Sequence, residues 1–284
     1  MERFVCVNGS DNLQIPSHIL QELELTSAEQ FHRNPGMIAS IAERMESSGW
    51  VRLPFCNTLC CEALGAAPTL SMAGARVKEP PYRQISDLPE TFSADTARLS
   101  AMMQALETLA ARGKAVAYNM EGPFSLLCTL LPMNRVFAAL RKPEGAAMLA
   151  RAEDWAIAYA DLAVSRGAKL LSFADPIATR DILGDRVFLN VYVPCLKRVL
   201  ARLQEKHPHI PVHLCGKLTQ SLLDTESCTV EIWNSEGCDT YGQALTRFCC
   251  EDTGGLVGHF CLNFLDAKRP YIKLIYFKEE RSLT

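Results

Sequence analysis

The strongest constraint on the fold of this chain is an alternation of short apolar runs with longer segments of helical periodicity. The short runs are apolar or β-branched and end at Gly, Pro, Asn or Asp, which is typical of strands. Strands that alternate with helices favour a parallel sheet wrapped in helices. About eight strand-like runs occur, the number that a closed barrel requires, at residues 50–55, 69–73, 115–119, 169–174, 210–215, 228–233, 255–260 and 271–277. We therefore predict an α/β fold built as a single (β/α)8 barrel of the TIM type.

The segments between these runs predict long amphipathic helices. Apolar residues recur along one stripe in residues 93–112 and again in 144–166, at the spacing that buries one face of a helix. Residues 185–204 continue the pattern, and Pro194 is expected to kink or divide that helix. A chain of 284 residues with 48% hydrophobic content can bury one large core. We expect a single domain, with an N-terminal arm and helix in 1–49 and the barrel in 50–284.

The charge pattern argues against nucleic acid as a partner. The formal net charge is only -3, and no run of Lys or Arg could neutralise a row of phosphates. The first residues lack a basic segment followed by an apolar one, and no apolar stretch approaches roughly 18 residues. We therefore expect a cytoplasmic protein that is neither secreted nor membrane-spanning.

The 12 cysteines are expected to be reduced thiols, because disulfide frameworks belong to short secreted chains with small cores. Most lie in apolar or helical surroundings, where free cysteine behaves as a small hydrophobe. The cysteines interpreted in this way are Cys6, Cys56, Cys60, Cys61, Cys128, Cys195, Cys228, Cys238, Cys249 and Cys250.

The two remaining cysteines belong to a pattern typical of a zinc site. His213 and Cys215 occupy alternate positions at the end of an apolar run, so both side chains point to the same side of a strand. Cys261 ends a second such run, and the ends of neighbouring barrel strands meet at one mouth. A lone His-x-Cys pair favours simple packing, but the matching third position favours zinc with an open position for substrate. His259 is an alternative third ligand, and we prefer Cys261 because two thiolates make a more electron-rich site.

Further polar residues at strand ends are candidates for the same mouth. Glu231 could fill the fourth zinc position if its run forms an inward-facing strand, or it could form an ordinary buried ion pair. Asp175 could bind substrate or orient a ligand, or it could cap a helix or turn. Asn119 and Glu121 precede Gly122, which permits close approach of the backbone or makes a simple turn.

The chain resembles the uroporphyrinogen decarboxylase superfamily, and within it the corrinoid-dependent methylcobamide:coenzyme M methyltransferases. The order of several short motifs carries the resemblance. They are RLPFC (52–56), EALGA (62–66), EGPFSL (121–126), KPE (142–144), FADPIA (173–178), HLCG (213–216) and GHFC (258–261). The family's zinc ligands correspond to His213, Cys215 and Cys261. The interval between Cys215 and Cys261 is shorter than is usual in the family.

The resemblance implies a barrel that transfers a methyl group from a methylcobamide, carried by a partner corrinoid protein, to a small thiol such as coenzyme M. It also implies Zn²⁺ as the metal that activates the thiol. A metal-free decarboxylase of the same superfamily is one alternative, although the Arg-rich segment with which decarboxylases hold the acidic side chains of the porphyrinogen is absent. The other alternative is a non-catalytic barrel that docks a corrinoid protein.

Overall fold

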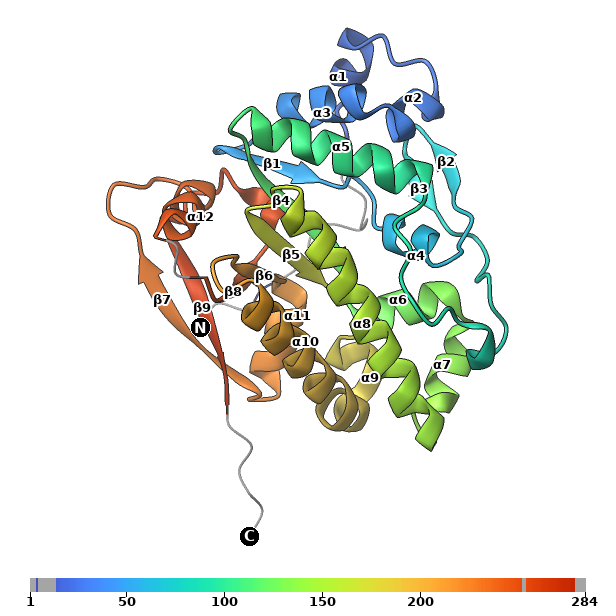
Figure 1. Cartoon of the computed structure of the whole chain (residues 1–284). Helices are drawn as coiled ribbons and strands as arrows, with labels where there is room; N and C mark the ends of the chain where they lie inside the picture. Colours follow the sequence, from blue (N-terminus) through green and yellow to red (C-terminus); the bar gives the residue numbers. More distant parts are fainter. Residues whose placement is uncertain (1–3, 5–13, 252–253, 279–284) are drawn as a thin grey trace.

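The computed structural model describes residues 4, 14–251 and 254–278, and its centre is one seven-stranded sheet (Figure 1). The strand order is β1-β4-β5-β6-β8-β9-β7. Strands β1, β4, β5, β6 and β8 run parallel, whereas β9 is antiparallel to β8 and β7 is antiparallel to β9. Their bounds are β1 Trp50–Leu53, β4 Ala115–Glu121, β5 Leu170–Ala174, β6 Val212–Cys215, β7 Cys228–Asn234, β8 Leu256–Phe260 and β9 Tyr271–Phe277.

The predicted α/β fold is confirmed, and its mostly parallel sheet is consistent with a TIM barrel. Three of the expected strands, β2, β7 and β9, are used differently from the expectation. Strand β2, Thr69–Ser71, pairs with β3, Gly74–Arg76, in a hairpin outside the main sheet. Strand β9 runs antiparallel because residues 261–270 join it to β8, and a parallel crossover needs a connection of a dozen residues or more. Among the described residues, β7 and β1 lie at opposite ends of the strand order.

The long predicted helices are confirmed and cover one face of the sheet (Figure 1). They are α5, Ala97–Ala111, and α8, Pro143–Ser165. In the third region the non-helical break lies at Gly184 (φ 70°) and not at Pro194: α9, Arg180–Val187, leads through a π-helical turn, Phe188–Tyr192, into α10, Val193–Lys206. Pro194 lies in the first turn of α10, directly after the π-helical turn, and the preceding residues Tyr192 and Val193 keep helical backbone angles. Outward-facing strand residues such as Val116 and Leu171 share the main apolar cluster with these helices.

Shorter helices complete the structure, and three of them precede β1. Their bounds are α1 Ser17–Glu22, α2 Ala28–Arg33, α3 Pro35–Arg44, α4 Leu59–Ala63, α6 Pro123–Leu130, α7 Met133–Ala139, α11 Gly216–Asp224 and α12 Tyr241–Cys250, with 3-10 turns at Ile85–Asp87 and Leu262–Phe264. Within the part of the chain that the structure describes, no helix has the length and apolar character needed to cross a membrane.

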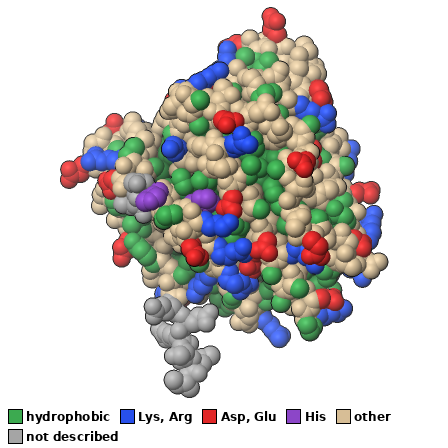
Figure 2. Space-filling view, viewed as in Figure 1, with side chains coloured by type: hydrophobic (Ala, Val, Ile, Leu, Met, Phe, Trp, Pro, Cys, Tyr) green, Lys and Arg blue, Asp and Glu red, His purple; other side chains and the backbone are tan. Residues whose placement is uncertain are grey.

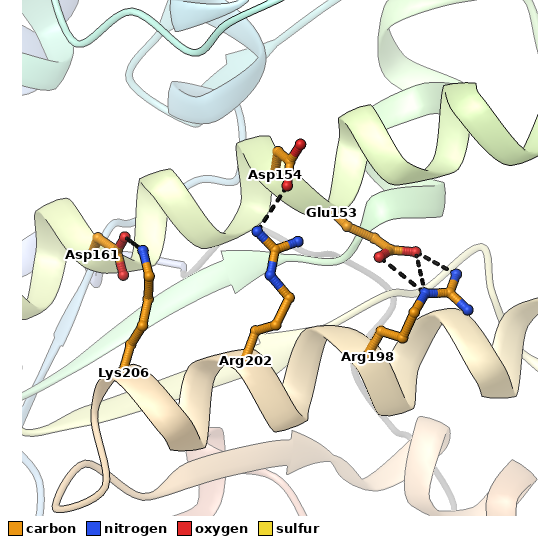
Figure 3. Close-up of polar contacts among 6 residues, drawn as sticks. All are labelled: Glu153, Asp154, Asp161, Arg198, Arg202 and Lys206. Atoms are coloured by element: carbon orange, nitrogen blue, oxygen red, sulfur yellow. Dashed lines mark hydrogen bonds and ion pairs between the residues drawn. The ribbon is translucent and has the colours of Figure 1, made fainter.

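Helices α8 and α10 run parallel and are joined by a row of ion pairs (Figure 3). The pairs are Glu153–Arg198, Asp154–Arg202 and Asp161–Lys206. The surface over these helices accordingly shows basic and acidic side chains interleaved (Figure 2). An interleaved surface gives no continuous basic path for a phosphate backbone.

Helix α12 packs on the opposite face of the sheet. Its buried residues join inward-facing residues of five strands in a second apolar cluster, whose members include Trp50, Ala117, Leu170, Tyr241, Ala244, Leu245, Phe248, Val257 and Ile272. The Trp50 indole donates a hydrogen bond of 3.1 Å to the Gly242 carbonyl oxygen. Alternate strand residues therefore serve two different layers of helix, as the period of two along a strand requires.

Candidate active site

His213 is held on the inner face of β6 in a dry environment. Its side chain is buried, and its Nε2 atom lies 2.8 Å from the Tyr241 hydroxyl at the start of α12. Its Nδ1 atom is also buried and has no hydrogen-bond partner among the described residues. Burial lowers the pKa of His213 to about 4, so the imidazole is neutral at physiological pH. A neutral imidazole with an uncommitted nitrogen is the form that binds metals.

Cys215 and Cys261 lie at the C-terminal ends of two hydrogen-bonded strands, β6 and β8. Cys215 is half-buried and precedes α11 as its N-cap residue. Cys261 is half-buried and follows β8 directly. The pairing of β6 with β8 shifts beside Cys215, so that Cys215 lies opposite Phe260. Both cysteines therefore lie at the same edge of the sheet.

The predicted ligands do not form a ready metal site. Among the described residues, no group of three His, Cys, Asp or Glu side chains is arranged to hold one metal ion. Coordination by His213, Cys215 and Cys261 together would therefore require side chains to move. The donor types still suit zinc, and the buried Nδ1 atom of His213 is a donor that the described residues leave unused.

His259, the alternative ligand, is committed elsewhere. Its Nδ1 atom lies 2.6 Å from Lys273 Nζ, and its Nε2 atom lies 3.0 Å from Gln220 Oε1. Its φ angle of 61° is in the left-handed region, which residues other than glycine rarely adopt. Both ring nitrogens of His259 therefore have partners among the described residues.

Asp175 follows β5 and holds the start of α6. It accepts hydrogen bonds from the backbone N–H groups of Phe124 (3.2 Å) and Ser125 (2.8 Å) and from the Ser125 hydroxyl (2.6 Å). Burial raises its pKa to about 6, although these hydrogen bonds oppose the rise. The nearby Tyr192 hydroxyl is buried, and its interaction with the Asp175 carboxyl group also opposes the rise in pKa. The geometry thus matches a helix cap, the simpler of the two roles considered for Asp175.

The other predicted mouth residues lie around this cap. A Cβ atom on Gly122 would lie 2.3 Å from Asp175 Oδ2, so Gly122 permits the close approach that the sequence suggested. Asn119 is half-buried and donates to the Pro54 carbonyl oxygen at 3.2 Å. Glu121 is half-buried and lies 4.0 Å from the Cys61 sulfur atom.

The expected placement of Glu231 is wrong. β6 pairs directly with β8, so the strand that carries Glu231 does not lie between them. Glu231 is exposed on β7, which pairs with β9 at the end of the sheet. The alternation of its run specified a strand but not its neighbours. This position gives no support to a role as a zinc ligand or catalytic group.

Comparison with known proteins decides the family. The profile of the uroporphyrinogen decarboxylase (URO-D) family matches residues 18–268, which is most of the chain. The chain belongs to the URO-D family. This finding confirms the resemblance seen in the motifs.

Relatives within the URO-D family include methyltransferases. The chain is 27% identical to the methylcobamide:CoM methyltransferase MtaA of Methanosarcina barkeri over 216 residues, which cover 70% of this chain and 62% of the relative. It is 29% identical to the methylcobamide:CoM methyltransferase MtbA of Methanosarcina mazei over 182 residues, covering 61% of this chain and 53% of the relative. The chain thus spans less than two thirds of the length of these relatives.

A solved structure supports the URO-D fold. The methyltransferase from Methanosarcina mazei superposes with a TM-score of 0.63 and 17% sequence identity, covering 86% of this chain and 75% of that chain. At this identity the likeness shows the fold alone.

Three residues of the site in this URO-D chain were not predicted. Tyr241 contacts His213, and Arg52 donates to the Leu262 carbonyl oxygen at 3.2 Å beside the end of β8. A Cβ atom on Gly216 would lie 2.7 Å from the ring of Phe4, so Phe4 packs on Gly216, which follows Cys215 in the chain. The sequence signalled only the start of α12, where Thr240 and Gln243 form a capping box. It carried no sign of which strand that helix would meet.

Proposed function

We propose that this chain is a zinc-dependent methyltransferase that moves a methyl group between a corrinoid, carried by a partner protein, and a small thiol such as coenzyme M. The buried and uncommitted Nδ1 atom of His213 carries the proposal, because it lies on the same strand as Cys215 and next to the strand that leads to Cys261. Membership of the URO-D family and likeness to two methylcobamide:CoM methyltransferases support it.

The proposed ligands are His213, Cys215 and Cys261, and zinc bound there would convert a substrate thiol to a thiolate at neutral pH. The chain prepares these groups in different ways. Burial keeps His213 neutral, and the N-terminal end of α11 beside Cys215 favours negative charge. The buried cap between Asp175 and α6 holds the neighbouring mouth in place.

In the proposed reaction, the thiolate sulfur forms a bond to the methyl carbon as the cobalt–carbon bond breaks. The bonding electron pair remains on cobalt, so cobalt(III) becomes cobalt(I) and the thiol becomes a methyl thioether. The role of this chain is to bind and orient the thiol against a corrinoid presented at the mouth.

The test combines metal analysis with a transfer assay. We expect about one zinc per chain and loss of the methyl group from methylcobalamin to at least one of coenzyme M, homocysteine and simple alkyl thiols. Cys261→Ala should lose both zinc and transfer, whereas Cys249→Ala, which removes another half-buried thiol, should keep both.

Three outcomes would contradict the proposal. One is negligible zinc in protein prepared without chelator, and another is full transfer by zinc-free protein. The third is a loaded protein that methylates none of the thiols. Decarboxylation of a porphyrinogen without metal, or binding of a corrinoid protein without transfer, would support the corresponding alternatives.

A further inference from the structure

Strand β7 ends the main sheet on one side (Figure 1). It pairs with β9 along all seven of its residues, and among the described residues no further strand lies beyond it. Within the same part of the chain, no backbone hydrogen bond joins β7 to any segment other than β9. Its outer N–H and C=O groups therefore form an open edge. A closed barrel would leave no such edge, because every strand then has two neighbours.

This edge lacks the features that usually keep open strands apart. Proteins protect an edge by making the strand very short, by placing Lys or Pro on it, or by bending it with a bulge. Strand β1, at the other end of the sheet, has only four residues, and a bridge between Ser47 and Trp50 covers part of it. Strand β7 has seven residues, contains neither Lys nor Pro, and pairs with β9 in an unbroken register. Its one charged residue is Glu231.

An exposed apolar side chain lies near the middle of the same strand. Ile232 is 59% exposed, more than any other large apolar residue that the structure describes as exposed. Directly across the strand pair it faces Lys273 of β9. Removing a side chain of this size from water is favourable by roughly 1.5–3 kcal/mol. The open backbone and the exposed isoleucine thus favour the same event, which is the addition of another strand.

We propose that β7 pairs antiparallel with β7 of a second copy of this chain, about a two-fold axis that passes beside Ile232. In such a contact the same surface serves both copies. The two Ile232 side chains then lie directly opposite each other, with Cβ atoms roughly 5 Å apart. Glu231 of each copy lies opposite Trp233 of the other copy, so no like charges meet directly. A register centred on Glu231 would instead place two carboxylates opposite each other, which is unfavourable.

Self-association is measured by sedimentation equilibrium of the wild-type chain over a range of concentrations. We expect a monomer–dimer equilibrium. Hydrogen exchange followed by mass spectrometry locates the contact. The β7 amides should exchange more slowly in samples that contain dimer than in samples diluted to monomer, because pairing engages the outer N–H groups.

The decisive variant is Ile232→Glu. Inside one chain the new carboxylate faces Lys273, whereas across the two-fold axis it faces its own copy. We expect it to raise the dimer dissociation constant by at least about tenfold, since it replaces an apolar pair by two like charges. The matched control is Ile182→Glu, because Ile182 is 48% exposed on α9, away from the edge. This control should dimerise like the wild type.

Several outcomes would overturn the proposal. One is a wild-type chain that stays monomeric at its highest soluble concentration, whether its β7 amides exchange fast or are covered by another segment of the same chain. Another is a dimer whose formation leaves the exchange of the β7 amides unchanged. The third is a folded Ile232→Glu variant that dimerises as strongly as the wild type. The wild-type measurements decide the matter even if the variant does not fold, and none of them depends on zinc.

Discussion

Asp175 shows how one buried side chain combines structural and electrostatic roles. Its carboxyl group satisfies backbone donors at the start of α6, yet burial raises its pKa from 3.8 to about 6. The folded state therefore binds the proton more tightly than the unfolded state. As pH rises from about 4 to about 6, the unfolded chain ionises this group first, and folding loses stability over that window.

Asp175→Asn should remove this contribution while its amide oxygen keeps an acceptor for the α6 donors. A shift of about two units corresponds to roughly 3 kcal/mol. As pH rises from 4 to 6, we expect the free energy of unfolding of the wild type to fall relative to that of Asp175→Asn. Above pH 6 to 7 the difference between the two should be constant. Urea unfolding at several pH values measures this difference. A difference that does not vary with pH would contradict the pKa of about 6.

At the scale of residues, the sequence placed most candidate groups near strand ends but could not assign their contacts. The spacing of apolar residues along each strand predicts that the strand ends are occupied by His213 and Cys215 on one strand and by Cys261 after another. The roles of Tyr241 and Arg52 depend on contacts between distant segments, for which a residue type alone carries no signal. Glu231 was misplaced for the same reason, since a period of two specifies which face a residue occupies but not which strand is its neighbour.

At the scale of elements, the ion pairs between α8 and α10 offer a direct comparison of buried and exposed charges. The Glu153 side chain is 4% exposed and forms two-pronged hydrogen bonds with Arg198. The Asp154 side chain, which pairs with Arg202, is 62% exposed. Both basic residues lie on the same face of α10 (Figure 3).

Arg198→Met should destabilise the protein by about 2 kcal/mol, because it leaves a buried carboxylate without its charged partner. Arg202→Met should have a much smaller effect, since water can solvate the exposed carboxylate of Asp154. Chemical denaturation of the two variants makes the comparison. Equal losses would show that burial does not set the strength of these pairs.

Elements with long apolar stripes were the most predictable part of the fold. Helices α5 and α8 agree with the pattern because one face of each meets the main core over several turns. The short runs at β2, β7 and β9 were recognised as strands, but their pairing was not. A connection such as 261–270 decides whether the next strand can return parallel, and tertiary packing decides which edge it joins.

At the scale of the whole molecule, two apolar clusters form the core of the URO-D fold. The main cluster spans the sheet and its outer helices, and the second joins α12 to the inner face. The proposed ligands lie at the ends of strands that are already packed on both sides. Zinc would therefore add to a stable fold instead of creating it.

Removal of zinc by a chelator should leave the circular dichroism spectrum and cooperative unfolding intact. Because zinc would bind the folded state in preference to the unfolded state, its removal should lower the unfolding midpoint. The midpoint should recover when zinc is restored. Thermal unfolding with and without chelator measures this. Loss of secondary structure on chelation would instead identify a structural metal site.

The contact between α12 and the inner face has a consequence for the order of folding. Tyr241 is 28 positions from His213, and the adjoining Gly242 is 192 positions from Trp50. Closing the loop between Trp50 and Gly242 costs conformational entropy, and this cost is offset only when the surrounding core packs. The nascent chain can offer His213 and Cys215 as a weak pair, but the oriented imidazole exists only after α12 has docked. Metal binding by an oriented His213 would thus follow the docking of α12 on the inner face of the sheet.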